Sequence, residues 1–191
     1  MNNFKLRFVR RLSFFIRDTS ASVSVESVFI FPLLAAWFVG SFVFFDAFKS
    51  RNTAAKASYT ISDVLSRRTA DANPAYLDNL HELYKNLVRA EDGETALRVS
   101  IIQWDGTDYV VEWSHSSSVL LETHTDQSIE ERADRIPILY EGEHIILVET
   151  YLNYNPAFDV GLNSDVWENF VVTSPRFASK LDCPTCTVLQ P

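Results

Sequence analysis

A run of nineteen residues without any charge, from Ser27 to Phe45, restricts the fold of this chain more than any other feature. About 20 apolar residues in a helix cross the ~30 Å hydrocarbon core of a bilayer. A helix buried in a soluble core usually keeps a polar stripe, which this run lacks. The run therefore predicts a transmembrane helix, and a membrane helix tolerates Pro32 better than a soluble helix does.

The charges on the two sides of the run predict its orientation. Residues 1–25 carry five basic and one acidic side chain, whereas residues 49–191 carry twelve basic and twenty-two acidic ones. Because basic flanks stay in the cytoplasm, we expect a single-pass membrane protein with a cytoplasmic N-terminus and an exported C-terminal part. The expected organisation is a basic leader at 1–21, a transmembrane helix at 22–48 and an exported domain at 49–191.

A cleaved signal peptide is the competing interpretation of the same segment. Such a peptide has a shorter apolar stretch, of about 7–15 residues, followed closely by a small-residue cleavage site. The nearest site of that kind, Ala55-Lys56-Ala57, lies ten residues beyond the run and behind two basic side chains. The membrane anchor is therefore the favoured interpretation.

Glu26 stands immediately before the uncharged run, where a carboxylate is costly and is a candidate functional group. It could simply extend to the membrane interface. The stretch Ala21-Ser22-Val23-Ser24-Val25-Glu26 follows a basic segment and is similar to the processing site of type IV prepilins. That resemblance implies cleavage between Ala21 and Ser22 by a prepilin peptidase. The Glu26 carboxylate of one subunit would then pair with the new Ser22 amine of a neighbour, offsetting the desolvation of both charges.

The longer segment "RDTSASVSVESVFIFPLLAAWFV" resembles the N-terminal signature of the TadE/TadG-like family, the minor pseudopilins of tight-adherence (Tad) pili. Val25-Glu26 and Pro32 match that signature, and Ala21 stands where family members usually have Gly. Two later stretches, at 146–158 and 169–178, resemble the family more loosely. The resemblance implies a protein of the bacterial inner membrane whose pilin-like exported domain lies in the periplasm. The partners that it implies are the inner membrane, a prepilin peptidase, other pilins and pseudopilins, and the Tad secretion machinery.

The exported part is expected to be an α+β domain with an antiparallel sheet. Apolar residues at spacings of three and four continue the first helix to about Arg68, and Pro74 is well placed as the first residue of a second helix. Asp105-Gly106 is a strong signal for a two-residue hairpin turn. The remaining expected elements are the second helix at 74–90, strands at 97–104, 107–113, 144–154 and 170–173, and a short helix near 128–135.

No catalytic motif is recognisable in the exported part, so we expect a non-enzymatic protein with no cofactor and no metal site. The four histidines share no ligand spacing and are expected to be solvated; they are His81, His115, His124 and His144. The acidic residues between 122 and 143 are expected to be solvated as well. The aromatic residues on the expected strands should pack across the sheet. The strongly acidic charge of this part also argues against a nucleic-acid partner.

Cys183-Pro-Thr-Cys186 near the C-terminus has the spacing of a redox or zinc pair. A redox pair would begin a helix, and a zinc site would need two further ligands nearby. Neither is evident, so the expected state in an oxidising periplasm is a small-loop disulfide between Cys183 and Cys186.

These observations lead to one preferred hypothesis and two alternatives. The preferred one is a non-catalytic, membrane-anchored, pseudopilin-like component of Tad pilus assembly, processed by a prepilin peptidase. The first alternative is an unprocessed single-pass membrane protein with a periplasmic binding or sensor domain. The second is a membrane-tethered periplasmic enzyme, which the missing catalytic motifs disfavour.

Overall fold

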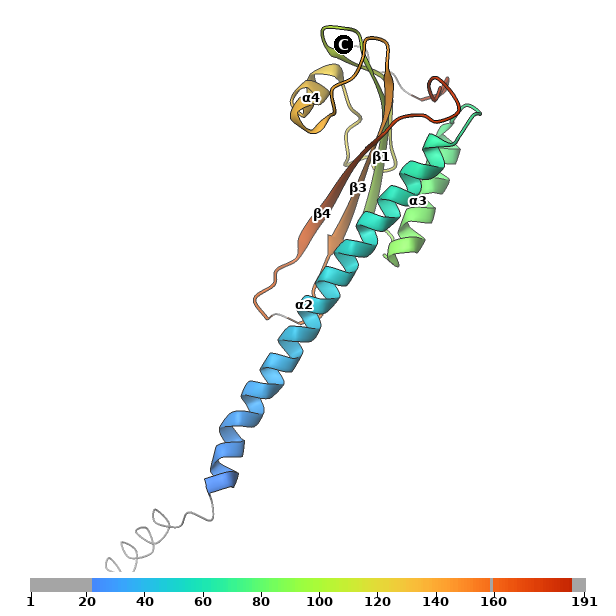
Figure 1. The fold of residues 1–191 in the computed structure, drawn as a ribbon. Helices are drawn as coiled ribbons and strands as arrows, with labels where there is room; N and C mark the ends of the chain where they lie inside the picture. The colour runs from blue at the N-terminus through green and yellow to red at the C-terminus, as the bar shows by residue number, and fades with distance from the viewer. Residues whose placement is uncertain (1–21, 159, 187–191) are drawn as a thin grey trace, which may run out of the picture. The chain divides into compact units, whose positions relative to one another are not determined.

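The computed structural model describes residues 22–158 and 160–186, in two compact units that meet between Phe45 and Asp46 (Figure 1). The first unit contains the N-terminal part of helix α2 (Ser22–Ser66). From Val23 onward this helix is long and apolar enough to cross a membrane. Most of its large side chains are exposed, with Phe29, Phe31 and Trp37 each about three-quarters exposed (74%, 74% and 77%), whereas Val43 is buried. Such exposure fits a helix whose solvent is lipid.

The second unit is an α+β domain built on one antiparallel sheet, which confirms the α+β class and the antiparallel sheet of the prediction. The spatial strand order is β2-β1-β3-β4, so the two edge strands are β2 and β4. The strands are β1 (Thr95–Trp104), β2 (Tyr109–Ser116), β3 (His144–Tyr154) and β4 (Asp165–Thr173). Helix α3 (Pro74–Val88) joins α2 to the sheet, and the β2–β3 connection contains α4 (Asp126–Glu130) and the short helix η2 (Ala133–Arg135).

Helix α3 begins where the sequence predicts. The Asn73 side chain accepts a hydrogen bond from the Tyr76 amide at 2.8 Å and caps the helix, and Pro74 follows it in the first turn. An Asn cap followed by Pro satisfies the free amides at a helix start without losing a needed donor. The helix ends with Arg89 in the left-handed conformation (φ 59°), and the next amide, of Ala90, donates to the Lys85 carbonyl.

The β1–β2 hairpin has a longer turn than the predicted two-residue one. The Asp105 carboxylate accepts hydrogen bonds from the amides of Thr107 and Asp108, both at 2.8 Å, and so closes a four-residue loop. Gly106 occupies φ 102°, which favours glycine. The backbone bonds that Asp105 makes also lower the pKa of its carboxyl group. β2 therefore starts at Tyr109 rather than at residue 107.

Other element boundaries also differ from the prediction: β1 starts two residues earlier, at Thr95, and β2 continues to Ser116. β4 starts at Asp165, five residues before the expected position, because it pairs with β3 along its whole length from Asp165↔Tyr154 to Thr173↔Ile146. Pairing with a long neighbour overrides the weak strand propensity of Asp, Glu and Asn. The expected helix at 128–135 is split into α4 and η2.

The sheet has a core on each face. One face packs on α2 and α3 and contains most of the buried apolar side chains, including Ile61, Leu77 and Trp113. Ser58 of α2 and Thr150 of β3 join their hydroxyls at 2.6 Å on this face. The other face carries a smaller apolar cluster around Ile102, Ile129 and Leu147, covered by the β2–β3 connection.

Candidate functional site

The first candidate site is the start of α2. Glu26 is exposed on this helix, and its side chain has neither a hydrogen bond nor an ion pair with residues 22–158 and 160–186. Ser22 is the first residue of the helix. Ala21 and the rest of the predicted leader lie outside the described residues. The predicted cleavage and charge pairing therefore stay predictions.

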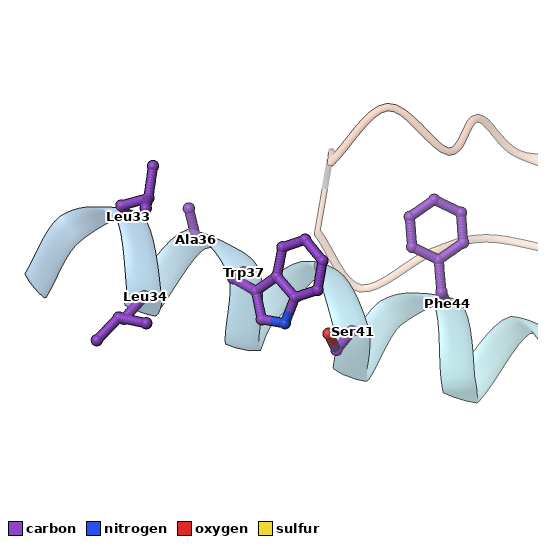
Figure 2. Close-up of a pocket in the computed structure, with 7 residues that line it drawn as sticks. Leu33, Leu34, Ala36, Trp37, Ser41 and Phe44 are labelled. Carbon is purple, nitrogen blue, oxygen red and sulfur yellow. The ribbon is translucent and has the colours of Figure 1, made fainter. Parts of the chain in front are cut away.

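Farther along the same helix, seven residues line an apolar surface pocket (Figure 2). Gly40 is one of them, and a Cβ there would meet nothing within 4 Å. The large side chains of Leu33, Trp37 and Phe44 project from the helix around it. The pocket offers apolar contact and one hydroxyl group, from Ser41, and no group that could perform chemistry.

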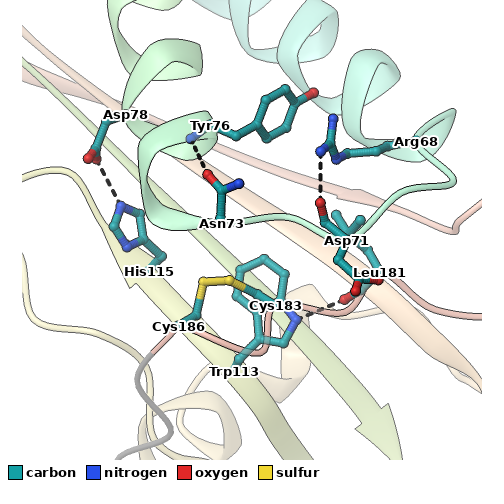
Figure 3. Close-up of a disulfide and its surroundings, with 10 residues drawn as sticks. All are labelled: Arg68, Asp71, Asn73, Tyr76, Asp78, Trp113, His115, Leu181, Cys183 and Cys186. Atoms are coloured by element: carbon teal, nitrogen blue, oxygen red, sulfur yellow. Dashed lines mark hydrogen bonds and ion pairs between the residues drawn. A yellow bond between two sulfur atoms is a disulfide. The ribbon is translucent and has the colours of Figure 1, made fainter.

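The second candidate site is the cysteine pair. Cys183 and Cys186 form a disulfide and are both buried in the core cluster on the helical face of the sheet (Figure 3). Beside them, the Trp113 indole donates to the Leu181 carbonyl at 2.8 Å. The Ala72 amide donates to the Asp182 carbonyl at 2.7 Å. The disulfide thus closes a C-terminal segment that covers Trp113 and the loop before α3. Its role in this arrangement is structural.

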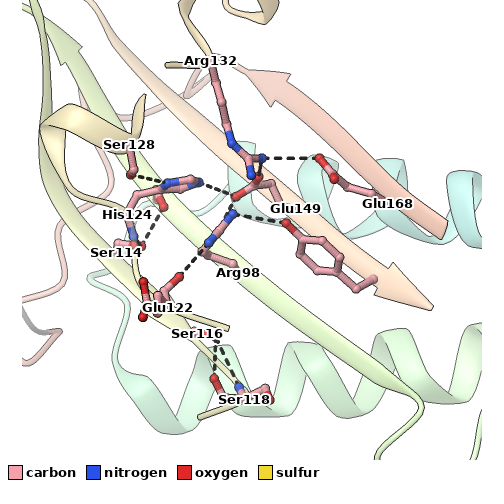
Figure 4. Close-up of polar contacts among 12 residues, drawn as sticks. Arg98, Ser114, Ser116, Ser118, Glu122, His124, Ser128, Arg132, Glu149 and Glu168 are labelled. Atoms are coloured by element: carbon pink, nitrogen blue, oxygen red, sulfur yellow. Dashed lines mark hydrogen bonds and ion pairs between the residues drawn. The ribbon is translucent and has the colours of Figure 1, made fainter. Parts of the chain in front are cut away.

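The third candidate is a buried charged cluster on the other face of the sheet, centred on Glu149 of β3 (Figure 4). The side chain of Glu149 has no exposed surface, and its two oxygens accept three close bonds. Arg98 Nε and His124 Nε2 lie 2.6 Å from Oε2, and Arg132 Nη1 lies 2.6 Å from Oε1. Arg98 faces Glu149 because the two are register partners on neighbouring strands. Three elements far apart in sequence thus meet on one carboxylate.

Each partner of Glu149 is itself held in place. Arg98 also donates to the Glu122 carbonyl at 2.7 Å and to the Tyr151 hydroxyl at 3.2 Å. Arg132 continues to Glu168 of β4 at 3.4 Å. The cluster therefore fastens the β2–β3 connection to the sheet around His124 and again at Arg132.

The groups around Glu149 determine its charge state. Burial by itself would raise the pKa of this carboxyl group. The hydrogen bonds from His124 and Arg98, and the positive charge of these groups, outweigh burial and lower the pKa to about 2. Glu149 is therefore ionised throughout the physiological range. Burial, with the Glu149 charge beside it, also raises the pKa of the Tyr151 hydroxyl.

Ser128, His124 and Glu149 follow one another in the order of a serine–histidine–carboxylate triad. The Ser128 hydroxyl lies 2.8 Å from His124 Nδ1, on the ring side opposite Glu149. The same hydroxyl, however, contacts both the amide and the carbonyl of Thr125, each at 2.9 Å, in the capping box of α4. A nucleophile must be free to reach a substrate, and Ser128 is engaged on all sides. The arrangement serves to orient His124.

The prediction of solvated histidines is wrong for His124, which is only 4% exposed. The other three are partly buried and each has a partner. His81 contacts Thr95, His115 lies 2.9 Å from Asp78, and His144 lies 3.2 Å from Glu112. Within the described ranges, no group of three or more His, Cys, Asp or Glu side chains could hold a metal ion.

The Glu149 cluster was not predicted from the sequence, although the sequence contains a signal for part of it. Arg98 lies between Leu97 and Val99, and Glu149 lies between Val148 and Thr150. Two opposite charges, each inside a strand rich in apolar residues, indicate a buried cross-strand pair. The contributions of His124 and Arg132 could not be found this way, because both lie on an irregular connection.

Comparisons of this chain with models of protein families, with curated proteins and with solved structures found no match.

Proposed function

We propose that this protein is a single-pass, membrane-anchored, pseudopilin-like component of Tad-type pilus assembly, and that its exported unit has no catalytic role. A prepilin peptidase would remove residues 1–21 on the cytoplasmic side. The exported α+β unit would stand in the periplasm or enter a pilus. The sequence resemblance around Val25-Glu26 and Pro32 supports this proposal, together with the apolar helix α2.

The observation that carries the proposal is the isolated carboxylate of Glu26. It is the only charged side chain of α2 before Asp46, and within the described part of the chain nothing pairs with it. An unpaired carboxylate at the edge of lipid is unfavourable, so a partner from outside the chain would stabilise it. The α-amine that cleavage creates on Ser22 of a neighbouring subunit has the opposite charge and lies in the same layer of the membrane.

The exported unit supports a structural role. The groups that could perform acid–base chemistry, Glu149 and His124, are buried and bonded to arginine and serine side chains. A general base must reach the proton that it removes. These two side chains instead hold a connection against a sheet.

The test is the mass of the mature chain extracted from membranes. Wild type should begin at Ser22. Ala21→Leu should block cleavage, because the peptidase must fit a small side chain before the scissile bond. Ala36→Leu, the same substitution inside the apolar span, is the matched control and should be cut normally. Glu26→Ala should also be cut, but its subunits should fail to co-assemble in crosslinking, since the Ser22 amine has lost its partner.

The outcomes separate this proposal from its alternatives. A wild-type chain that keeps Met1 would contradict the pseudopilin proposal and favour an unprocessed membrane-anchored binding or sensor domain. A chain that starts near Ser58 would identify a conventional signal peptide instead.

A further inference from the structure

We infer that the unit Asp46–Pro191 pairs with a second copy of itself through the open edge of β4, so that two four-stranded sheets form one continuous sheet. The two β4 strands run antiparallel, and Asn169 faces its own copy at a two-fold axis. The inference goes beyond the proposed function. It concerns this unit by itself and depends neither on cleavage nor on Glu26.

The edge formed by β2 is closed. The pairing of β2 with β1 contains a bulge, and the Val111 amide of β2 donates to the Asp126 carboxylate of α4 at 2.7 Å. The connection that follows β2 also bonds to the strand, through the His124 amide and the Ser114 hydroxyl at 2.9 Å. A bulge and a covering segment both keep a sheet edge from pairing with another chain.

The edge formed by β4 has neither of these features (Figure 1). The register of β4 with β3 has no shift over nine residues, and β4 contains neither Lys nor Pro. Among the described residues, no backbone hydrogen bond joins β4 to any segment other than β3. Alternate residues of such a strand direct their N–H and C=O groups away from the sheet. β4 therefore offers backbone donors and acceptors to a further strand.

The charged side chain inside β4 does not protect this edge. Glu168 bonds to Arg135 at 2.9 Å and to Arg132 at 3.4 Å, within the same unit. Its charge is therefore balanced before another strand approaches. The neighbouring side chains are apolar and incompletely buried, and Val166 is 54% exposed. A long edge strand of this kind is a template for pairing.

The sequence of β4 indicates that the partner is a second copy. When two copies run antiparallel about Asn169, all nine residues of each strand are paired and no two like charges face each other. Aromatic and β-branched residues then face one another, and such cross-strand pairs stabilise a sheet. The facing pairs are Asp165–Thr173, Val166–Val172, Trp167–Val171, Glu168–Phe170 and Asn169–Asn169.

Other registers are less favourable. A parallel pairing in register would place Asp165 and Glu168 opposite their own copies, and like charges directly opposite each other destabilise a sheet. An antiparallel pairing centred on Glu168 would also bring two carboxylates together. The register centred on Asn169 avoids both and uses the whole strand.

Disulfide crosslinking of the full-length chain in mild detergent tests the pairing. The Asn169→Cys chain is treated with a mild oxidant, and the fraction of dimer is measured on a non-reducing gel. Directly opposite Cβ atoms in an antiparallel pair lie about 4.5–5.5 Å apart, close to the separation that a disulfide needs. The native cysteines are joined and buried, so crosslinking is confined to the introduced thiol.

Asp165→Cys is the matched control, because residue 165 is exposed on the same strand. In the proposed register it lies about 26 Å from its own copy, at ~3.3 Å per residue from 165 to 173. We expect Asn169→Cys to crosslink several-fold more than Asp165→Cys. A mixture of Asp165→Cys and Thr173→Cys chains should crosslink to each other, since these positions face one another, and either chain alone should not.

A substitution at the edge tests the contact itself. Val166→Lys in the Asn169→Cys chain places a charge opposite Val172 of the second copy and should lower crosslinking several-fold. Because Val166 is more than half exposed, the lysine spares the fold of the unit. Val119→Lys, the same substitution at a fully exposed valine of the β2–β3 connection, should leave crosslinking unchanged.

Equal crosslinking at 169 and 165 would overturn the pairing, because it would show chance collision only. No crosslinking at 169, together with the mass of a monomer in light scattering, would also overturn it. Unchanged crosslinking after Val166→Lys would contradict the proposed register. Glu26→Ala should leave the crosslink at 169 unchanged, so failure of the edge pairing and failure of the proposed function are read separately.

Discussion

Replacing Glu149 with glutamine tests the buried cluster directly, because it removes the charge and keeps the size of the side chain. The pKa of Glu149 is about 2 in the folded chain, against an ordinary value of 4.5. A pKa difference of one corresponds to about 1.4 kcal/mol, so the charged form contributes about 3 kcal/mol to folding near neutral pH. Removing one partner of a buried ion pair typically costs about 3–5 kcal/mol. We expect Glu149→Gln to lower the free energy of unfolding by about 3 kcal/mol.

The lowered pKa of Glu149 also determines how its contribution to the free energy of unfolding depends on pH. Because the folded pKa is lower than the unfolded one, the folded chain binds fewer protons, and the contribution of Glu149 is fully present above pH ~5. It is lost as the pH falls from about 4.5 toward 2, as wild-type Glu149 becomes protonated. The difference in stability between wild type and Glu149→Gln should therefore be largest at pH 7 and should shrink over that acidic range.

The assay is urea unfolding of the full chain in mild detergent, followed by tryptophan fluorescence, to which the buried Trp113 contributes. Glu168→Gln is the matched control. Glu168 bonds to Arg132 and Arg135 at the rim of the same cluster, with its side chain 34% exposed. A partly exposed pair contributes at most about 1 kcal/mol. Equal losses for the two variants at pH 7 would refute the claim that burial and pairing at Glu149 stabilise the fold.

Three further outcomes are expected. A C-terminal alkaline phosphatase fusion should be active in cells, and activity only of a cytoplasmic reporter would contradict the exported orientation. Cys183 and Cys186 should be alkylated only after reduction, and labelling of the native chain without reductant would contradict the disulfide. Replacing both cysteines with serine should lower the free energy of unfolding by about 2 kcal/mol, the value expected for a disulfide that closes a four-residue loop. Gly106→Ala should cost about 1 kcal/mol or more in the same urea assay, since Gly106 has a φ of 102°, a conformation that strains a residue with a side chain. Gly40→Ala, which meets open space, should cost less, and equal losses would argue against backbone strain at Gly106.

Several elements could be predicted from the sequence because their signals are local. The uncharged run made the apolar part of α2 evident, and Asn73-Pro74 located the start of α3. β3 was predicted with its observed bounds, His144–Tyr154, since a long apolar run in the middle of a sheet needs no particular neighbour to be recognised. The Cys183–Cys186 pairing was also expected, because the two residues are close in sequence.

Other features were decided only by the tertiary structure, because they depend on residues far apart in the chain. The full length of β4 follows from its pairing with β3, and its own composition is a weak strand signal. His124 has the sequence surroundings of a solvated loop residue, and it is buried because Glu149, 25 residues later, brings it to the sheet together with Arg98. A carboxylate can be buried only where several donors converge on it, and that convergence is a property of the folded chain. In the same way, only the folded chain brings Asp46 and Tyr154 together, in a hydrogen bond between residues 108 positions apart.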